Sequence, residues 1–331
     1  MEAAMGRLTR RQRVVRFSLG EAPRTREETM AAEEPLEIRL GGRPFSVTMR
    51  TPGDDFDLVG GFLVGEGVVS AAEHLLSLRF CAGEDEDGRQ TFNVVEAQLG
   101  PGAAVPDPSL DRHVYTTSSC GICGTASIDA VAKTSRFALD PERGRVELPV
   151  LLRLPETLRA GQALFGKTGG VHAAALFTTE GELLCLREDV GRHNAVDKVV
   201  GWALREGRLP LADTVLQVSG RASFELVQKA WLAGIPVLSA VSAPSSLAVE
   251  LAQRAGMTLA GFSRGSTVNV YTHPGRIAAS DAGAAGPPAA APAPPAVPED
   301  PYPRHQASRQ PARGQAALDA TPHSKHEQET A

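Results

Sequence analysis

The first third of the chain shows a strand-like alternation of apolar and polar residues followed by a helical pattern. Residues 36–40 alternate, Gly41–Gly42 follows, and the alternation resumes over 45–49. Two alternating runs joined by glycines predict a β-hairpin, because successive strand side chains point to opposite faces. Residues 54–65 repeat their apolar positions at helical spacing and predict a helix. Further strands are expected at 90–99 and 113–117, and a helix at 125–133.

From residue 171 onwards, short apolar runs alternate with amphipathic ones. Strands are expected at 171–177, 183–186, 214–218, 236–240, 257–260 and 268–271. Helices are expected after the capping residues Asn194 and Ser223, and over 245–255 with Gly256 ending the last one. This alternation predicts an α/β sandwich with a mixed, mostly parallel sheet. Ligands of such folds bind at the carboxyl ends of the strands.

Composition divides the 331 residues into four parts. Residues 1–33 are polar and basic, and we expect a poorly ordered tail. Residues 34–110 are expected to form an N-terminal α+β subdomain, and 111–277 the α/β domain that carries the chemistry. Residues 278–331 are rich in Ala and Pro and lack large apolar side chains, so we expect a disordered tail that cannot offset its chain entropy.

Charge and apolar content narrow the possible functions. The apolar share is 42%, the charged share 22% and the formal net charge −5. This net excess of acidic residues argues against a dedicated nucleic-acid binder, because phosphate contacts need clustered Lys and Arg. The sequence has no apolar run long enough for a transmembrane helix, and Arg10–Arg11 lacks the apolar stretch of an export signal. We therefore expect a cytoplasmic protein without membrane association.

The chain has four cysteines, and only Cys120 and Cys123 are close in sequence. A glycine follows each of these two. If the loop opens a helix, the helix N-terminus favours the reactive thiolate of Cys120. Three interpretations stay open: half of a zinc site, a thioredoxin-like redox pair, or a cysteine that carries sulfur as a persulfide. A zinc site needs four ligands, and no second cysteine pair exists.

Four further segments carry polar residues beside glycines at predicted strand ends. His172, after Gly169–Gly170, is either a base, a ligand or an ordinary core histidine. In 187–198, Arg187 and Arg192 could bind phosphate and Asp189 could pair with His193, or the charges could only order the turn. The other two segments are 218–223, with Arg221 in a strand–glycine–helix turn, and 261–267, with Arg264 and hydroxyl groups suited to a phosphate or guanine.

These ordered segments together resemble the FdhD family of sulfur carriers required for formate dehydrogenase activity. The resemblance rests on 118–124, 169–174, 187–195, 219–229 and 261–274, and spans about residues 34–277.

The resemblance implies that a cysteine desulfurase charges the carrier with a persulfide. The carrier then passes this sulfur to the Mo-bis(molybdopterin guanine dinucleotide) cofactor of formate dehydrogenase. It implies that the first cysteine, Cys120, carries the sulfur and that Cys123 has a supporting or exchange role. It also implies a homodimer. The implied cofactor-binding residues are Phe262, Ser263, Arg264, Gly265, Ser266 and Thr267.

The family also implies a fold similar to that of cytidine deaminases, a three-layer sandwich. Zinc deaminases place Glu two residues after His, ahead of a Cys-x-x-Cys pair. Here Ala174 stands in the glutamate position and the cysteine pair precedes His172. We therefore expect no bound metal. Two rival functions remain, a cofactor-binding chaperone without sulfur chemistry and a dithiol oxidoreductase.

Overall fold

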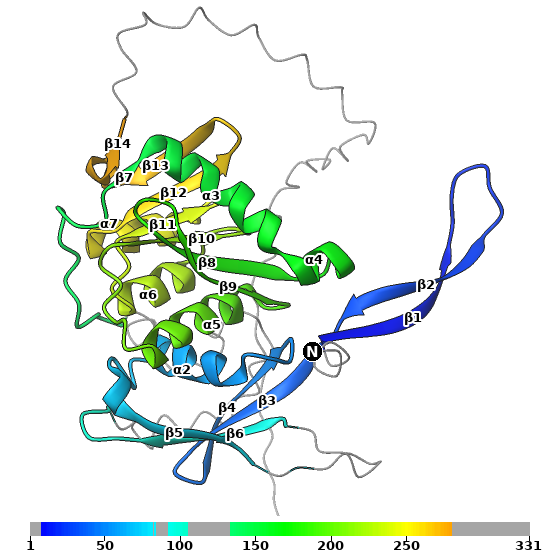
Figure 1. Ribbon diagram of the computed structural model, residues 1–331, viewed down its shortest axis with the longest axis horizontal. Helices are drawn as coiled ribbons and strands as arrows, with labels where there is room; N and C mark the ends of the chain where they lie inside the picture. The colour runs from blue at the N-terminus through cyan, green and yellow to red at the C-terminus, as the bar shows by residue number, and fades with distance from the viewer. Residues whose placement is uncertain (1–7, 82, 84–91, 105–132, 280–331) are drawn as a thin grey trace, which may run out of the picture. The chain divides into compact units, whose positions relative to one another are not determined.

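The computed structural model describes residues 8–81, 83, 92–104 and 133–279. Its largest sheet has six strands in the order β13-β12-β11-β10-β8-β9 (Figure 1). Their bounds are β8 His172–Thr178, β9 Leu183–Asp189, β10 Thr214–Val218, β11 Val237–Ala240, β12 Thr258–Arg264 and β13 Thr267–Thr272. β10, β11 and β12 run parallel to one another, whereas β8, β9 and β13 pair with antiparallel neighbours.

The sheet is therefore mixed, as predicted, but the prediction that it is mostly parallel is wrong, because three of its five strand pairings are antiparallel. Strands β8 and β9 are joined by a short turn at Gly181 and pair directly as a hairpin. So do β12 and β13, which turn at Gly265. A two-strand connection this short allows only antiparallel pairing.

Helices cover both faces of this sheet and make three layers (Figure 1). On one face lies α3, Leu148–Gly161, whose buried leucines 151, 154 and 158 pack on Phe177 and Val215. On the other face lie α5 Arg192–Arg205, α6 Phe224–Leu232 and α7 Ser246–Ala255. The three layers agree with the prediction. The particular likeness to cytidine deaminases stays a prediction.

A second sheet has four strands in the order β4-β3-β6-β5. Its strands are β3 Glu34–Leu40, β4 Arg43–Arg50, β5 Leu75–Phe80 and β6 Val94–Leu99. Helix α2, Asp55–Gly65, packs on this sheet and on α5. One hydrophobic core contains Leu36 of β3, Leu58 of α2 and Val199 of α5. The predicted N-terminal subdomain and the α/β domain therefore share a core.

The contact between α2 and α5 depends on two glycines. A Cβ atom on Gly61 would lie 1.8 Å from the carbonyl oxygen of Asp197, and one on Gly201 would lie 1.8 Å from that of Asp57. Only glycine permits such an approach of two helix backbones. This close crossing brings the polar ends of α5 and α2 next to each other.

Residues 9–31 form an antiparallel hairpin of β1 Thr9–Arg16 and β2 Arg24–Ala31. The prediction of a poorly ordered tail is therefore wrong for these residues. Few of their side chains are buried, so the hydrophobic pattern of a core strand is missing. Cross-strand pairs of opposite charge, such as Arg11 with Glu27, occur instead. The hairpin depends on backbone pairing between two exposed strands. Such strands need no alternation of apolar and polar residues, so the sequence pattern did not reveal them.

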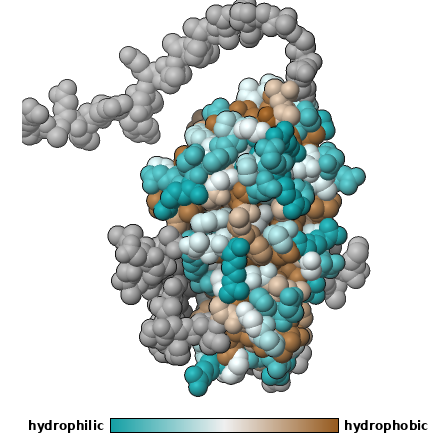
Figure 2. All heavy atoms as spheres, turned by 90° about the vertical axis from the view of Figure 1, so that its left-hand side faces the viewer, coloured by the Kyte–Doolittle hydropathy of each residue, from teal (hydrophilic) through white to brown (hydrophobic). Residues whose placement is uncertain are grey.

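Short elements complete the described chain. They are the 3-10 turns at Ala72–His74 and Pro274–Arg276, α4 Ala163–Thr168, and the paired strands β7 Val146–Glu147 and β14 Ile277–Ala278. The strand predicted at 113–117, the helix at 125–133 except Lys133, and nearly all of the C-terminal tail lie outside the described residues. No described helix is long and apolar enough to cross a membrane. On the face in Figure 2, hydrophobic and hydrophilic residues are interspersed in small groups.

Candidate functional site

Three parallel strands end at one edge of the large sheet and build the floor of a pocket. Ser219 follows β10, Val241 follows β11, and Ser263 lies near the end of β12. His172 begins the antiparallel strand β8 and therefore reaches the same edge. The sequence predicted this place for a ligand, because loops and helix starts gather at the carboxyl ends of strands.

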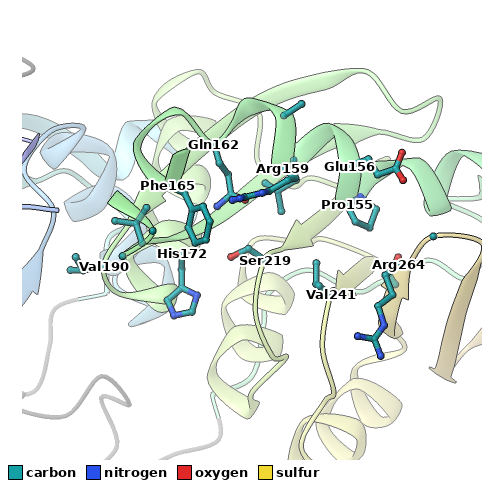
Figure 3. Close-up of a pocket in the computed structure, with 17 residues that line it drawn as sticks. Pro155, Glu156, Arg159, Gln162, Phe165, His172, Val190, Ser219, Val241 and Arg264 are labelled. Atoms are coloured by element: carbon teal, nitrogen blue, oxygen red, sulfur yellow. The ribbon is translucent and has the colours of Figure 1, made fainter. Parts of the chain in front are cut away.

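The pocket has a volume of about 980 Å³, and α3 and α4 form its opposite wall (Figure 3). In Figure 3, Phe165 and His172 lie toward one end and Arg264 lies at the other. The guanidinium carbon of Arg159 lies 4.0 Å from the ring centroid of Phe165. Glu188 of β9 fixes this end, because its carboxylate accepts hydrogen bonds of 2.8 Å from the backbone N–H groups of Leu164 and Phe165.

Sequence reasoning missed this wall entirely. Leu151, Leu154 and Leu158 recur at the spacing of a buried helix face, and this signal could have predicted α3. Nothing in the spacing could have shown that Arg159 and Phe165 face the ends of strands more than fifty positions later. Gly169 ends α4 with φ 65°, the left-handed conformation that glycine adopts at helix C-termini.

His172 is a half-buried histidine that lines the pocket. Its pKa is lowered, first by burial and then by the positive charge of Arg192 and the neighbouring His193. The imidazole is therefore uncharged at neutral pH. The next residue, Ala173, donates its N–H to the hydroxyl of Ser219 at 2.9 Å, which ties the start of β8 to the end of β10.

The turn between β12 and β13 contains the residues predicted to bind the cofactor. Phe262 has φ 52°, an unusual value for a residue with a side chain, and the pairing of the two strands is irregular between Gly261 and Arg264. The bulge directs Ser263 into the pocket, where Ser263 and Arg264 both line it with Gly265. The Arg264 guanidinium lies 5.8 Å from the Phe262 ring. The predicted roles of Phe262–Thr267 in binding stay a prediction.

The charged segment 187–198 is mostly structural. Arg187 pairs with Asp57 of α2 at 2.8 Å, so it is not free to bind a phosphate. Asp189 does not pair with His193 as suggested. Its buried carboxylate binds Lys198 at 2.8 Å and accepts a hydrogen bond from Thr51.

Two other residues of this segment have roles that the pattern did not indicate. Asn194 was predicted to cap α5, but the helix begins earlier, after Gly191. The amide of Asn194 instead donates to the backbone oxygen of Met49 and to Asp189. His193 lies 3.3 Å from the hydroxyl of Ser223. Ser223 does occupy the N-cap position of α6, as predicted, although its side chain makes no capping hydrogen bond.

Cys120 and Cys123 lie outside the described residues. The other two cysteines can be judged from their surroundings. Cys185 is buried in the core, and burial raises the pKa of its thiol to about 12. A thiol with that pKa is protonated at neutral pH and is a poor nucleophile. Cys81 is half-buried at the end of β5. Among the described residues, no group of three or more His, Cys, Asp or Glu side chains could hold a metal ion.

Comparison with known proteins identifies the family. The model of the FdhD/NarQ family matches residues 31–278. This chain belongs to the FdhD/NarQ family. The match contains every segment from which we expected chemistry, and it includes both the second sheet and the strand-end pocket. The predicted family is therefore confirmed.

Relatives of this FdhD/NarQ family member have names that state a function. The chain is 59% identical over 283 residues to the sulfur carrier protein FdhD of Streptomyces avermitilis, covering 85% of this chain and 100% of the relative. It is 43% identical to the protein of the same name from Sulfolobus acidocaldarius, over 76% of this chain and 92% of the relative.

One solved structure is similar as well. It is a protein of Desulfotalea psychrophila described as a candidate formate dehydrogenase accessory protein. The TM-score is 0.61 at 26% identity, and the match covers 82% of this chain and 100% of the other.

Proposed function

We propose that this protein is a sulfur carrier that receives a sulfur atom on Cys120 and delivers it to the Mo-bis(molybdopterin guanine dinucleotide) cofactor of a formate dehydrogenase. The single observation that carries the proposal is membership of the family over residues 31–278, with relatives named sulfur carrier protein FdhD. The position of Cys120 in the predicted reactive loop supports it.

The first step is an exchange between sulfur atoms. The thiolate of Cys120 attacks the terminal sulfur of a persulfide on a cysteine desulfurase. A new sulfur–sulfur bond forms on the carrier, and the donor's cysteine leaves as a thiolate. Oxidation states balance without a further reactant, because the sulfane sulfur simply changes partner. Cys123 would assist as the neighbouring thiol.

The second step brings the carrier and the cofactor together. The strand-end pocket supports this step, because it combines a volume of about 980 Å³ with Arg264 and the backbone of Gly265 at its rim. Arginine binds phosphate oxygens through paired N–H groups, and such groups occur in the guanine dinucleotide part of the cofactor. We propose that both steps take place in the cytoplasm. The carrier acts as a homodimer, which meets the cysteine desulfurase in the first step and formate dehydrogenase in the second.

Sulfur loading tests the first step. The full-length protein is incubated with a cysteine desulfurase and cysteine, and the added mass of one sulfur atom is located by peptide mass spectrometry. We expect the adduct on Cys120 and its loss in Cys120→Ser. Cys81→Ser is the control, because Cys81 is a partly exposed cysteine outside the predicted reactive loop. An adduct that persists in Cys120→Ser and disappears in Cys81→Ser would contradict the assignment.

Sulfur loading, together with assays of GDP binding, insulin reduction and formate dehydrogenase maturation, separates the rival functions. A chaperone without sulfur chemistry would bind GDP and leave all four cysteines unmodified. A dithiol oxidoreductase would instead reduce insulin with thioredoxin reductase as electron donor. Maturation of formate dehydrogenase by the Cys120→Ser variant would reject the sulfur-carrier proposal altogether.

A further inference from the structure

Two arginines at the rim of the strand-end pocket are held in place but have no anionic partner among the described residues. Arg159 lies over the ring of Phe165 and Arg264 over the ring of Phe262. Both arginines are exposed, and neither guanidinium makes a hydrogen bond or an ion pair with any residue within the described ranges. Stacking on an aromatic ring fixes a guanidinium while its outer face and its N–H donors stay available.

The floor of the same pocket carries polar atoms without partners. Ser263 is fully buried and lines the pocket, and its hydroxyl has no hydrogen-bond partner among the residues that the structure describes. The side-chain oxygens of Gln217 and Ser239 are in the same state. Gln217 of β10 and Ser239 of β11 lie opposite each other in the sheet. They precede the floor residues Ser219 and Val241, respectively, by two positions. Buried polar groups nearly always have a partner, so this floor is suited to a polar ligand.

The two ends of the pocket differ in chemistry. The end at Arg264 offers an exposed cation and the flexible backbone of Gly265, which suit a phosphate. The end at Arg159 offers a flat aromatic surface, the ring of Phe165. A flat cationic group on such a surface suits a planar aromatic ring better than a phosphate.

We propose that Arg159, stacked on Phe165, binds against the face of an aminopyrimidinone ring of the ligand. This proposal rests on the proposed function, since guanine and pterin, the two ring systems of the cofactor, both contain that ring. Gln162 is only 7% exposed, lines the same end, and makes no side-chain hydrogen bond to a described residue. Its amide can both donate to and accept from the ring edge. Arg159 is thus a specificity residue, and Arg264 binds the phosphates.

Calorimetric titration of the full-length protein with GDP, neopterin and pyrophosphate tests this division. Arg159→Ala is expected to weaken the binding of at least one ring-containing probe by roughly 10-fold, which is the usual scale of one lost stacking contact. Pyrophosphate should bind to this variant as it does to the wild type. Arg159→Lys should be as weak as Arg159→Ala, because a lysine keeps the charge but lacks the plane.

One control variant and several possible outcomes complete the test. Arg153→Ala lies on the same helix but outside the pocket, and should bind every probe normally. A selective loss of GDP assigns the site to guanine, and a selective loss of neopterin assigns it to the pterin. Retained affinity in Arg159→Lys, or weaker pyrophosphate binding in Arg159→Ala, would mean a phosphate contact and overturn the proposal.

Unchanged binding of both ring probes to Arg159→Ala, with loss in Arg264→Ala, would also overturn it and leave the proposed function intact. Failure of the wild type to bind any probe would overturn the ring site. Sulfur loading of Cys120 would then still decide the sulfur-carrier function.

Discussion

At the scale of single residues, buried charges connect the two sheets and are the side chains whose loss should be felt most. Lys198 of α5 is 1% exposed, and its ammonium group binds both the carboxylate of Asp189 and the backbone oxygen of Thr51. Thr51 follows β4, and Asp189 ends β9. The ion pair therefore connects the second sheet to the edge of the large sheet, where Asp189 pairs with His172.

Lys198→Met should destabilise the protein by about 3 kcal/mol or more, because it leaves the Asp189 carboxylate buried without its cation. Urea unfolding at neutral pH measures the change. The exposed pair of Arg145 and Glu142 offers a control, and Arg145→Met should change the free energy of unfolding by less than about 1 kcal/mol. Equal effects of the two substitutions would show that burial of the Lys198 pair contributes nothing.

Glu225 should make the stability depend on pH in the acidic range. Burial alone would raise its pKa, but the neighbouring Ser223 and His193, whose Nε2 lies 3.7 Å from the carboxylate, prevail and lower the pKa to about 2. An acid whose pKa is lowered by folding stabilises the folded state above its ordinary pKa of about 4.5. That contribution is lost as the pH falls from about 4.5 toward 2.

Glu225→Gln should therefore be less stable than the wild type at pH 7, and the difference should shrink as the pH falls below about 4.5. Chemical denaturation of both proteins at several pH values between 7 and 3 measures this. A difference that is the same at every pH would show that the ionised carboxylate is not responsible.

At the scale of elements, the crossing of α2 and α5 determines where the polar residues of the site lie. α5 begins with Arg192 and His193 next to the pocket, and it is held against α2 through Gly61 and Gly201. A wider crossing would shift the start of α5 relative to β8 and β9, on which it packs. Helix packing and site geometry are therefore coupled in this fold.

Gly61→Ala should destabilise the protein by several kcal/mol, because the new methyl group meets backbone atoms that cannot move aside. Gly60→Ala is the matched control on the same helix. Its Cβ would find its nearest neighbour at 3.5 Å, an ordinary contact, so we expect little loss and a small gain in helix propensity. The thermal midpoints of the two variants measure the contrast, and similar midpoints would contradict the close crossing.

At the scale of the whole molecule, residues up to Ala282 belong to one compact unit. The residues beyond Ala282 are rich in Ala and Pro and have few large apolar side chains to bury. The family match also ends at residue 278. The proposed function therefore depends on the first unit.

A chain that ends at Ala282 should unfold at the same temperature as the full-length protein and should load the same amount of sulfur. Differential scanning calorimetry and the mass-spectrometric loading assay measure the two quantities. A lower midpoint in the shortened chain would show that residues after Ala282 stabilise the folded unit.

Patterns along the chain were enough to predict most of the elements and the family. Local signals were sufficient for the β3–β4 hairpin, for α2, and for α7 with its Gly256 end, because each depends on neighbouring residues. The five ordered segments were also sufficient to predict the family that the comparison confirmed.

How these parts meet depends on contacts that form only in the folded chain. The direction of β10 against β8, the α3 wall and the pairing of Arg187 with Asp57 all join residues far apart in the chain. Such pairings depend on which surfaces pack together, and no spacing along the sequence encodes them. The same reason applies to the pocket, whose floor and opposite wall come from segments that share no local pattern.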